Sequence, residues 1–440
     1  MKKLIETIKN IFKIEELRKR ILYTFGLIMI FRIGSFIVIP GINPNAISGL
    51  ASSVANNGLM GLLDMFSGGA FGQASILALG IMPYISASIV VQLLGIVVPY
   101  FQRLQKEGES GRRKINQLTR YLTIGVLLIQ GPAYLVSLPA LGVPAAAFVF
   151  GNTFFFKVVG VIILLAGTMF TMWLGEKITD KGIGNGVSLI ITVGIVARLP
   201  YALLAEFNAR FSESVGGFVF FVIELAILAI IFAATIALVQ AVRKVPVQYA
   251  KRIVGNKQYG GVRQYLPMKI NAAGVMPIIF AQALMMLPIL FGRWFPGFAA
   301  TFGNMMGFGY NITFFLLVVA FTYFYTAITI NTTQMADDMK KNGGFIPGIK
   351  PGKKTAEYLD NIMTRVTLPG SIFLGLIAIL PSFAMMIGVN QQFASFFGGT
   401  SLLILVGVVL DTLQQIESHL LSRHYDGLMK TGRLKGRSGV

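Results

Sequence analysis

Apolar and polar stretches alternate along the chain in a pattern that is typical of membrane-spanning helices. Ten apolar stretches stand out, at residues 21–39, 74–98, 119–138, 153–173, 185–204, 215–240, 271–292, 311–331, 366–387 and 399–418. A helix that crosses a bilayer needs about 20 predominantly apolar residues, and each stretch is close to that length. The pattern predicts an all-α polytopic membrane protein with ten transmembrane helices.

The composition excludes several classes of protein. Hydrophobic residues make up 55% of the 440 residues and charged residues only 13%, against roughly 25% charged residues in an average soluble protein. An ordinary soluble globule and a disordered chain are therefore excluded. The chain has no cysteine, which also excludes a disulfide-rich secreted domain.

Positive charge collects in one set of connecting segments. The chain carries 38 Lys and Arg against 18 Asp and Glu, a net charge of +20, which in a soluble protein would indicate a nucleic-acid partner. Of the 38 basic residues, 33 lie in six segments: 1–20, 99–120, 174–184, 241–270, 332–365 and the tail after 420. A ten-span arrangement puts all six on one side, and Lys and Arg mark the cytoplasmic side. We therefore expect both termini in the cytoplasm.

The second span of each half contains the same glycine–proline pattern. The sequence reads GIMP at Gly80–Pro83 and GVMP at Gly274–Pro277. Proline removes a helical hydrogen bond and glycine lowers the cost of bending, so we expect a broken helix at both places. Five spans per half invert the second half relative to the first, and matched broken helices then indicate a pathway between the halves. The competing interpretation is that Gly and Pro are common in membrane helices.

The charge and span patterns divide the chain into four parts. We expect an amphipathic cytoplasmic arm at 1–20, a first half at 21–205, a second half at 206–420 and a basic cytoplasmic tail at 421–440. The second half carries the long cytoplasmic loops 241–270 and 332–365.

A short apolar segment precedes the second span. Gly58–Phe66 is only about two helical turns long, too short to cross a bilayer. Ser67, Gly68 and Gly69 then interrupt it. Backbone at membrane depth that does not span must be buried in protein or line a cavity. A small interfacial helix on the outer surface is the equally open alternative.

The residue types needed for catalysis are nearly absent. There are two histidines and no cysteine, and no cluster has metal-ligand or Ser/His/Asp spacing. The sequence therefore predicts neither an enzyme nor a metal or cofactor site, so a partner or an ion gradient must supply energy. Among the few charges inside spans, Arg32, Glu224 and Asp411 form no proton relay. For these three we favour structural pairing or snorkelling over a coupling role.

Nine motifs, in order along the whole chain, resemble the SecY family, the channel subunit of the bacterial preprotein translocase. They are FRIGSF at 31–36, MFSGGA at 65–70, LGIMPYISASI at 79–89, KEGESGRRKI at 106–115, MWLGEKITDKGIGNGVS at 172–188, VQYAKR at 247–252, LPMKINAAGVMPIIFA at 266–281, FIPGIKPG at 345–352 and GGTSLLI at 398–404. The resemblance implies an hourglass channel between two inverted five-helix halves in the cell inner membrane. Such a channel passes unfolded secretory proteins across the membrane and releases signal sequences and transmembrane segments to lipid.

The resemblance also implies three sets of pore residues. The constriction ring would be Ile81, Ile85, Val187, Ile191, Ile279 and Ile404, the plug would be residues 58–71 with Leu59, Met60, Leu62, Leu63, Met65 and Phe66, and the lateral gate would include Ser88, Gln92 and Asn271. The first four ring residues form two i, i+4 pairs, each on one helix face. A ring of branched apolar side chains seals around an extended chain, and blocks ions by dewetting when the pore is empty.

The partners follow from the same resemblance. They would be SecE, SecG, the SecA motor ATPase, the ribosome with its RNA, preprotein signal sequences and membrane lipid. Docking would fall to Arg243, Lys244, Lys251, Arg252 and Lys350. Segment 241–270 has seven basic residues and no acid, which favours a phosphate surface. The competing interpretation is that these charges only set topology. Family members often carry Arg where this chain has Lys350, so a bidentate fork is lost while the charge remains.

A second class of function also fits inverted repeats with broken helices, namely a secondary transporter of a small solute. An apolar constriction and the lack of an ion-coupling site favour the channel.

Overall fold

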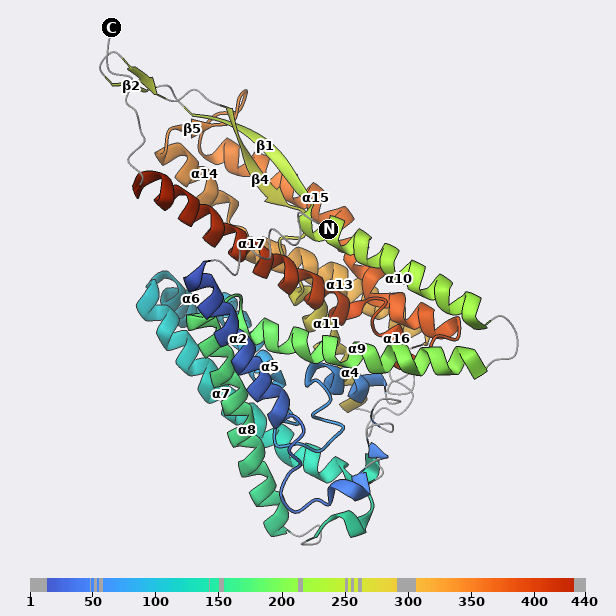
Figure 1. Cartoon of the computed structure of the whole chain (residues 1–440). Helices are drawn as coiled ribbons and strands as arrows, with labels where there is room; N and C mark the ends of the chain where they lie inside the picture. Colours follow the sequence, from blue (N-terminus) through green and yellow to red (C-terminus); the bar gives the residue numbers. More distant parts are fainter. Residues whose placement is uncertain are drawn as a thin grey trace. The chain divides into compact units, whose positions relative to one another are not determined.

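The computed structural model describes residues 14–47, 49, 50, 54, 58–141, 143–149, 154–212, 217–249, 252–254, 257–259, 263–290 and 306–430 (Figure 1). The chain divides into two compact units, each described below by itself. Unit 1 comprises residues 1–202 and 407–440, and unit 2 comprises residues 203–406.

Each of the ten predicted spans contains a helix. The helices are α2 (Glu15–Gly34), α5 (Met82–Val97), α7 (Glu109–Ser137), α8 (Phe154–Lys181), α9 (Gly186–Ser212), α10 (Gly217–Gln240), α11 (Met276–Leu290), α13 (Phe308–Thr329), α15 (Lys353–Met386) and α17 (Gly399–Lys430). Among the described residues, six of these are long and apolar enough by themselves to cross a membrane, and the bent pair α5 and α6 would be a seventh. The all-α polytopic prediction is confirmed.

Several helix ends differ from the predicted ones. The second span was expected from residue 74, but α5 begins at Met82 because Pro83 favours the first turn of a helix over its interior. α7 begins at Glu109 and α15 at Lys353, each more than two turns before the apolar stretch. Such extensions carry polar residues, which a hydropathy pattern alone assigns to loops.

Unit 1 builds its core where α7 and α8 pack on each other and on the loops before α5. Buried side chains include Leu127 and Leu135 of α7 and Leu164 of α8, with Ile39 and Phe148 from the loops. Short elements connect these helices: η1 (Pro44–Ile47), α4 (Gly58–Phe66), α6 (Pro99–Lys106), η2 (Pro139–Leu141) and η3 (Ala145–Ala147). A second cluster joins Phe31 of α2 to Leu174 of α8 and Ile190 of α9.

Unit 2 combines a helical core with a small sheet. Tyr310 and Phe314 of α13 pack with Ile278 of α11, Leu374 of α15 and Leu403 of α17. α14 (Thr332–Lys341) and the short helix α16 (Gln391–Ala394) complete the helices. The unit gives α13 and α15 a long shared interface, where Gly375 lies against the ring of Phe315.

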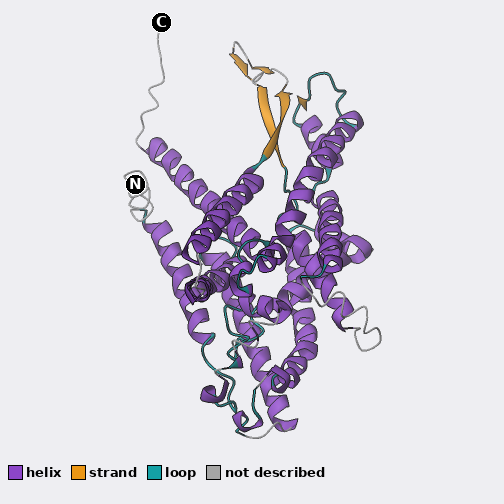
Figure 2. Ribbon diagram, turned by 90° about the vertical axis from the view of Figure 1, so that its right-hand side faces the viewer, coloured by secondary structure: helices purple, strands orange, loops and turns teal. Residues whose placement is uncertain are grey.

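The basic segment 241–270, expected as a loop, forms β-strands. β1 (Val242–Tyr249) pairs antiparallel with β4 (Arg263–Lys269) and with β5 (Gly344–Phe345), and β2 (Arg252–Val254) pairs with β3 (Lys257–Tyr259) at the far end of the hairpin (Figure 2). One face of the sheet packs through Val245 and Val247 on Met339 of α14 and Leu359 of α15. The hairpin is therefore anchored on helices of its own unit.

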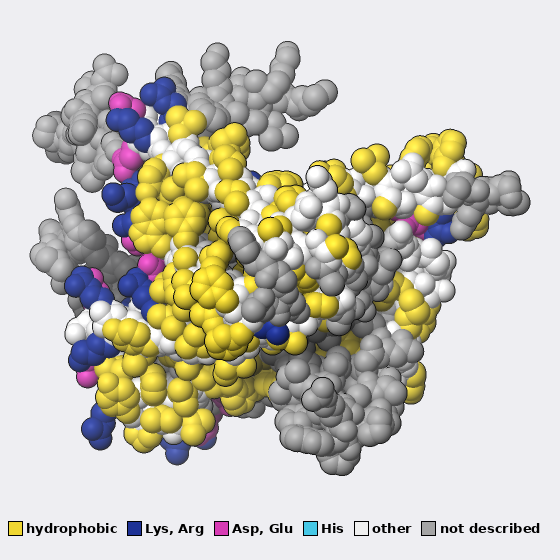
Figure 3. All heavy atoms as spheres, turned by 90° about the horizontal axis from the view of Figure 1, so that it is seen from below, with side chains coloured by type: hydrophobic (Ala, Val, Ile, Leu, Met, Phe, Trp, Pro, Cys, Tyr) yellow, Lys and Arg dark blue, Asp and Glu magenta, His cyan; other side chains and the backbone are white. Residues whose placement is uncertain are grey.

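Large hydrophobic side chains remain exposed on many helices, and Figure 3 shows hydrophobic side chains covering wide areas of the face in view. On α10, Phe218, Val219 and Phe220 are successive exposed residues. A helix that is apolar all round has no water-facing side. Such helices are typical of a protein whose outer surface meets lipid.

Candidate functional site

The two predicted helix breaks have the same local geometry. Gly80 has φ of +50° and Gly274 has φ of +63°, the left-handed region that favours glycine. In each case a helix begins two residues later, at Met82 and Met276, with proline as its second residue. The predicted breaks are confirmed, and each is a turn followed by a new helix rather than a bend within one.

All six predicted ring residues lie at the start of a helix. In unit 1, Ile81 immediately precedes α5 and Ile85 lies one turn on, with the amide of Ile85 donating to the carbonyl of Ile81 (3.1 Å). Val187 and Ile191 occupy the first two turns of α9, where Val187 lies against Gly175 of α8. In unit 2, Ile279 and Ile404 lie in the first two turns of α11 and α17. Ile81, Ile191 and Ile404 are buried. The ring itself stays a prediction.

The short apolar segment is a helix, as expected. α4 covers Gly58–Phe66, Met65 and Phe66 are buried, and Met60 and Leu63 pack at the edge of the unit 1 core. The side chains of Leu59 and Leu62 lie outside the described part. The turn that follows α4 lies close to both helix starts that carry candidate ring residues in this unit: Ser67 lies beside Gly80, and Gly68 lies beside Gly194 of α9. The last three residues of the helix, 64–66, are thus buried in protein.

A buried acid organises the end of α4. Asp64, 2% exposed, forms an ion pair with Arg198 of α9, and its Oδ1 accepts the amide of Gly72 at 2.7 Å. The carbonyl of Asp64 also accepts the amide of Gly69 (2.8 Å) and the hydroxyl of Ser67 (3.0 Å). From α2, Nη1 of Arg32 donates to the carbonyl of Gly68 at 2.7 Å. Two arginines from two helices therefore hold one turn.

The residues that follow this turn are held in place by a different helix, α7. The hydroxyl of Tyr134, on α7, donates to the carbonyl of Phe71 at 2.8 Å. The rings of Phe71 and Tyr134 also pack with their centroids 4.6 Å apart. Phe71 thus belongs to the unit 1 core, whereas Gly68 and Gly69 just before it both have positive φ.

Sequence reasoning missed most of these polar contacts. Arg32 was expected to have a structural partner, and the carbonyl of Gly68 is one; Glu224 was expected to be paired, and it binds Arg210 at 2.7 Å. Asp64 and Arg198 were not singled out as partners. An acid inside a nine-residue apolar segment was the available signal, because a charge at membrane depth needs a partner.

Asp411, the third intramembrane charge, lines a polar groove of unit 1 with a volume of about 440 Å³. Asn185 and Ser188 at the start of α9 line the same groove, together with Thr412 and Gln415 of α17. Oε1 of Gln415 accepts the amide of Gly184 at 2.9 Å, which ties the connection between α8 and α9, residues 182–185, to α17.

The candidate gate residues lie in both units. On α5, Nε2 of Gln92 donates to the hydroxyl of Ser88 at 3.4 Å, a long bond between neighbouring turns. Asn271, just before α11, is buried, and its Oδ1 has no hydrogen-bond partner among the described residues. The role of these residues in a gate stays a prediction.

The candidate docking residues of the hairpin are not equivalent. Arg243 and Lys244 are both exposed neighbours on β1, so their side chains leave opposite faces of the sheet. Arg252 is in β2, opposite Tyr259 of β3. Lys251 lies outside the described residues.

Lys350 projects from a turn that is held by a hydrogen bond from the next helix. The hydroxyl of Thr355, a buried residue, donates to the carbonyl of Lys350 at 2.9 Å. Gly348 and Gly352 on either side have φ of +83° and +96°. The Lys350 side chain is exposed, so a fixed backbone presents a single ammonium group to solvent.

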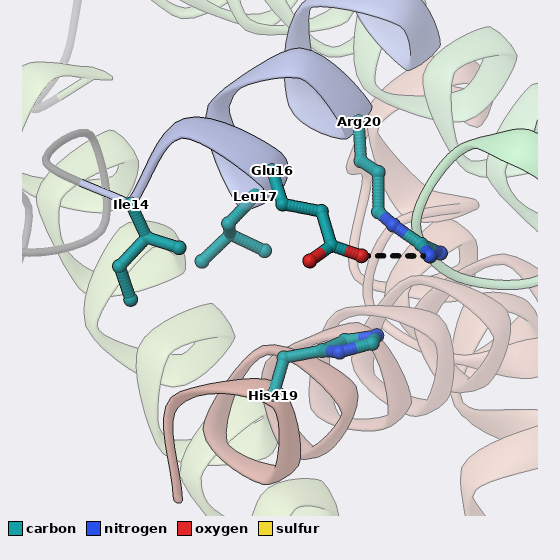
Figure 4. A pocket seen from close by; sticks show the side chains of 5 residues that line it. All are labelled: Ile14, Glu16, Leu17, Arg20 and His419. Atoms are coloured by element: carbon teal, nitrogen blue, oxygen red, sulfur yellow. Dashed lines mark hydrogen bonds and ion pairs between the residues drawn. The ribbon is translucent and has the colours of Figure 1, made fainter. Parts of the chain in front are cut away.

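A small pocket lies between α2 and α17 (Figure 4). Ile14, Glu16, Leu17 and Arg20 line it from one side and His419 from the other, and Arg20 Nη2 donates to Glu16 at 3.3 Å. Within the described residues, no group of three or more His, Cys, Asp or Glu could hold a metal ion.

Comparison with known proteins gives consistent matches. The SecY family profile matches residues 75–413. The chain is 44% identical over 434 residues to "Protein translocase subunit SecY" of Streptomyces scabiei, covering 95% of this chain and 98% of that protein. It is 42% identical over 454 residues to the protein of the same name from Chlamydia trachomatis, covering 98% and 99%.

Solved structures share the fold. "The structure of a protein conducting channel" matches with a TM-score of 0.61 at 17% identity, covering 92% of this chain and 93% of that chain. "Sec61 in the Canine ribosome-channel complex from the endoplasmic reticulum" matches with a TM-score of 0.58 at 16% identity, again covering 92% and 93%.

Proposed function

The chain belongs to the SecY family of protein translocase subunits, and from that premise we propose which of its residues seal and open the protein-conducting channel that it forms. The protein is a multi-pass membrane channel subunit. We assign the seal to the six apolar residues at the helix starts, Ile81, Ile85, Val187, Ile191, Ile279 and Ile404.

The observation that carries this assignment is the position of α4. The turn that follows it, at Ser67 and Gly68, touches Gly80, next to Ile81, and Gly194, three residues after Ile191. A short buried helix beside apolar residues from two helix starts is what a plug against a constriction requires. We therefore assign residues 58–71 as the plug. The lateral gate would use Ser88, Gln92 and Asn271.

The cytoplasmic surface would receive the driving partners. The exposed Arg243 and Lys244 of β1, together with the basic residue Arg252 in the strand β2, favour an anionic partner such as ribosomal RNA. The turn at Lys350 favours a protein contact with the SecA motor. SecE and SecG would complete the complex. The charge distribution supports cytoplasmic termini in the inner membrane.

Reconstitution tests the proposal. Vesicles that contain this chain with SecE should import a secretory precursor when SecA and ATP are added, and import should stop without either. Vesicles without this chain are the control. Equal import in both kinds of vesicle would contradict the proposal. The alternative of a small-solute transporter has no support from the relatives.

A further inference from the structure

The plug helix carries a charge that an apolar seal does not need. Asp64 lies on α4 among buried apolar residues and is itself only 2% exposed. Its ion-pair partner Arg198 is on α9, about two helical turns beyond Ile191. A buried carboxylate persists only where it is paired and hydrogen-bonded. The pair therefore fixes where α4 sits.

The neighbouring glycines have no room for a side chain beside the two arginines. A Cβ on Gly69 would lie 3.1 Å from Nε of Arg198, and one on Gly68 would lie 2.8 Å from Nη1 of Arg32. A Cβ on Gly194 would lie 3.0 Å from the amide nitrogen of Gly68. Side chains at these positions would displace the guanidinium groups or the turn. The close fit thus depends on all three glycines.

The Asp64–Arg198 ion pair is suited to a contact that must break when the channel opens. Burying two charges costs nearly as much as their attraction returns, so a buried ion pair specifies position more than it adds stability. The Arg198 side chain is 23% exposed, so it is only partly enclosed, and we expect water in the open channel to hydrate it when α4 leaves. Asp64 regains water on leaving. Opening therefore exchanges a buried pair for two hydrated charges at a small net cost.

We propose that Arg198 and Arg32 are positioning residues of the plug, and that opening breaks the Asp64–Arg198 ion pair, the hydrogen bond from the amide of Gly72 to Asp64 and the Arg32–Gly68 bond. Gly68 and Gly69 would be the hinge, because Phe71 stays held by Tyr134. This inference rests on the proposed plug function of residues 58–71.

The test uses the complete channel complex in planar bilayers. Arg198→Gln leaves the buried carboxylate of Asp64 without a positive partner. The helix α4 should then be displaced, and resting ion conductance should rise about tenfold or more. Asp64→Asn combined with Arg198→Gln strands no charge, and its conductance should lie between the wild type and Arg198→Gln. Arg113→Gln, which removes an exposed arginine of α7, is the matched control and should not change conductance.

Labelling gives an independent readout. The chain has no cysteine, so Met65→Cys introduces a single thiol on the plug at a buried position. The rate of its reaction with a membrane-impermeant maleimide should rise from the wild type to the double variant and to Arg198→Gln, the same order as the conductance. A structural role in packing alone would make the double variant at least as leaky as Arg198→Gln, which would overturn the proposal.

Deletion of Leu59–Phe66 separates failure of this inference from failure of the plug assignment. Unchanged conductance in the deletion would contradict both. The second case is that the deletion raises conductance while the double variant keeps the conductance and labelling rate of the wild type. That result would overturn only the role of the arginines. That comparison holds even if Arg198→Gln does not accumulate.

Discussion

Nη2 of Arg210 lies 2.7 Å from Oε1 of Glu224, so a buried ion pair ties the end of α9 to α10. Arg210 also binds Glu206, one turn earlier, through Nε at 3.0 Å. Oε2 of Glu206 accepts the amide of Asn390 at 2.8 Å. One guanidinium thus balances two carboxylates that are almost fully buried.

Loss of Arg210 should therefore destabilise the protein strongly. Arg210→Gln leaves two buried acids without a cation, and we expect the free energy of unfolding to fall by about 3–5 kcal/mol. Glu224→Gln leaves one acid for one arginine and should cost no more than about 1 kcal/mol. The midpoint of thermal unfolding of the purified complex in detergent measures both.

An exposed ion pair provides the matched control. Arg120 of α7 donates to both carboxylate oxygens of Glu176 on α8, at 2.7 to 3.1 Å, with side chains 44% and 30% exposed. Pairs in water contribute less than about 1 kcal/mol, so Glu176→Gln should barely move the midpoint. Equal shifts for Glu176→Gln and Arg210→Gln would contradict the argument from burial.

The expected membrane topology rests on the distribution of charge alone and is tested separately. Because 33 of 38 basic residues lie in segments on one side of a ten-span arrangement, reporter fusions after Lys257 and after Lys353 should be cytoplasmic. A fusion near Phe302 should be external. A periplasmic signal from the fusion after Lys257 would be incompatible with ten spans.

Hydrophobic patterning predicted the spans because a helix that crosses the hydrocarbon core of a membrane needs a long run of apolar residues. It did not predict the β1–β4 hairpin, whose exposed and buried positions alternate over a few residues within a strongly basic segment. Nor did it pair Asp64 with Arg198, or Arg210 with Glu224. Those contacts join positions that are 134 and 14 residues apart, and a local pattern carries no information on which distant charges meet.

The seal should fail when its apolar surface becomes polar. Ile81→Asn and Ile191→Asn place amides at two buried helix-start positions, which should wet the constriction and raise resting ion conductance. Deletion of Leu59–Phe66 should raise it too, transiently if neighbouring residues refill the gap. Unchanged conductance in bilayers for both Asn variants would mean that these residues do not line the pore.

Ribosome binding should depend on the hairpin in a salt-dependent way. Lys251→Gln and Arg252→Gln should weaken binding of ribosomes to channel-containing vesicles while membrane level and topology stay normal. Each lost phosphate contact should reduce the slope of log affinity against log salt by about one. Glu357→Gln, near the start of α15, is a suitable control. If both variants bind ribosomes fully and the salt slope is unchanged, these charges do not contact the ribosome and only help to set topology.

The final prediction concerns the turn at Lys350. If its charge only helps to fix orientation, its loss should have no effect, because other basic residues remain on the same side. If it docks the motor, ATP-driven import should fall while topology stays normal. Lys350→Glu should be worse than Lys350→Gln, because repulsion is added to lost attraction, and Lys350→Arg should be tolerated because the charge is kept. Lys353→Gln, at the start of α15, is the matched control for charge. The measurement is precursor import into vesicles matched for channel content. Full import by Lys350→Glu would remove the docking role of this turn, because the hydroxyl of Thr355 binds the backbone carbonyl of residue 350, a bond that does not depend on the side chain at that position.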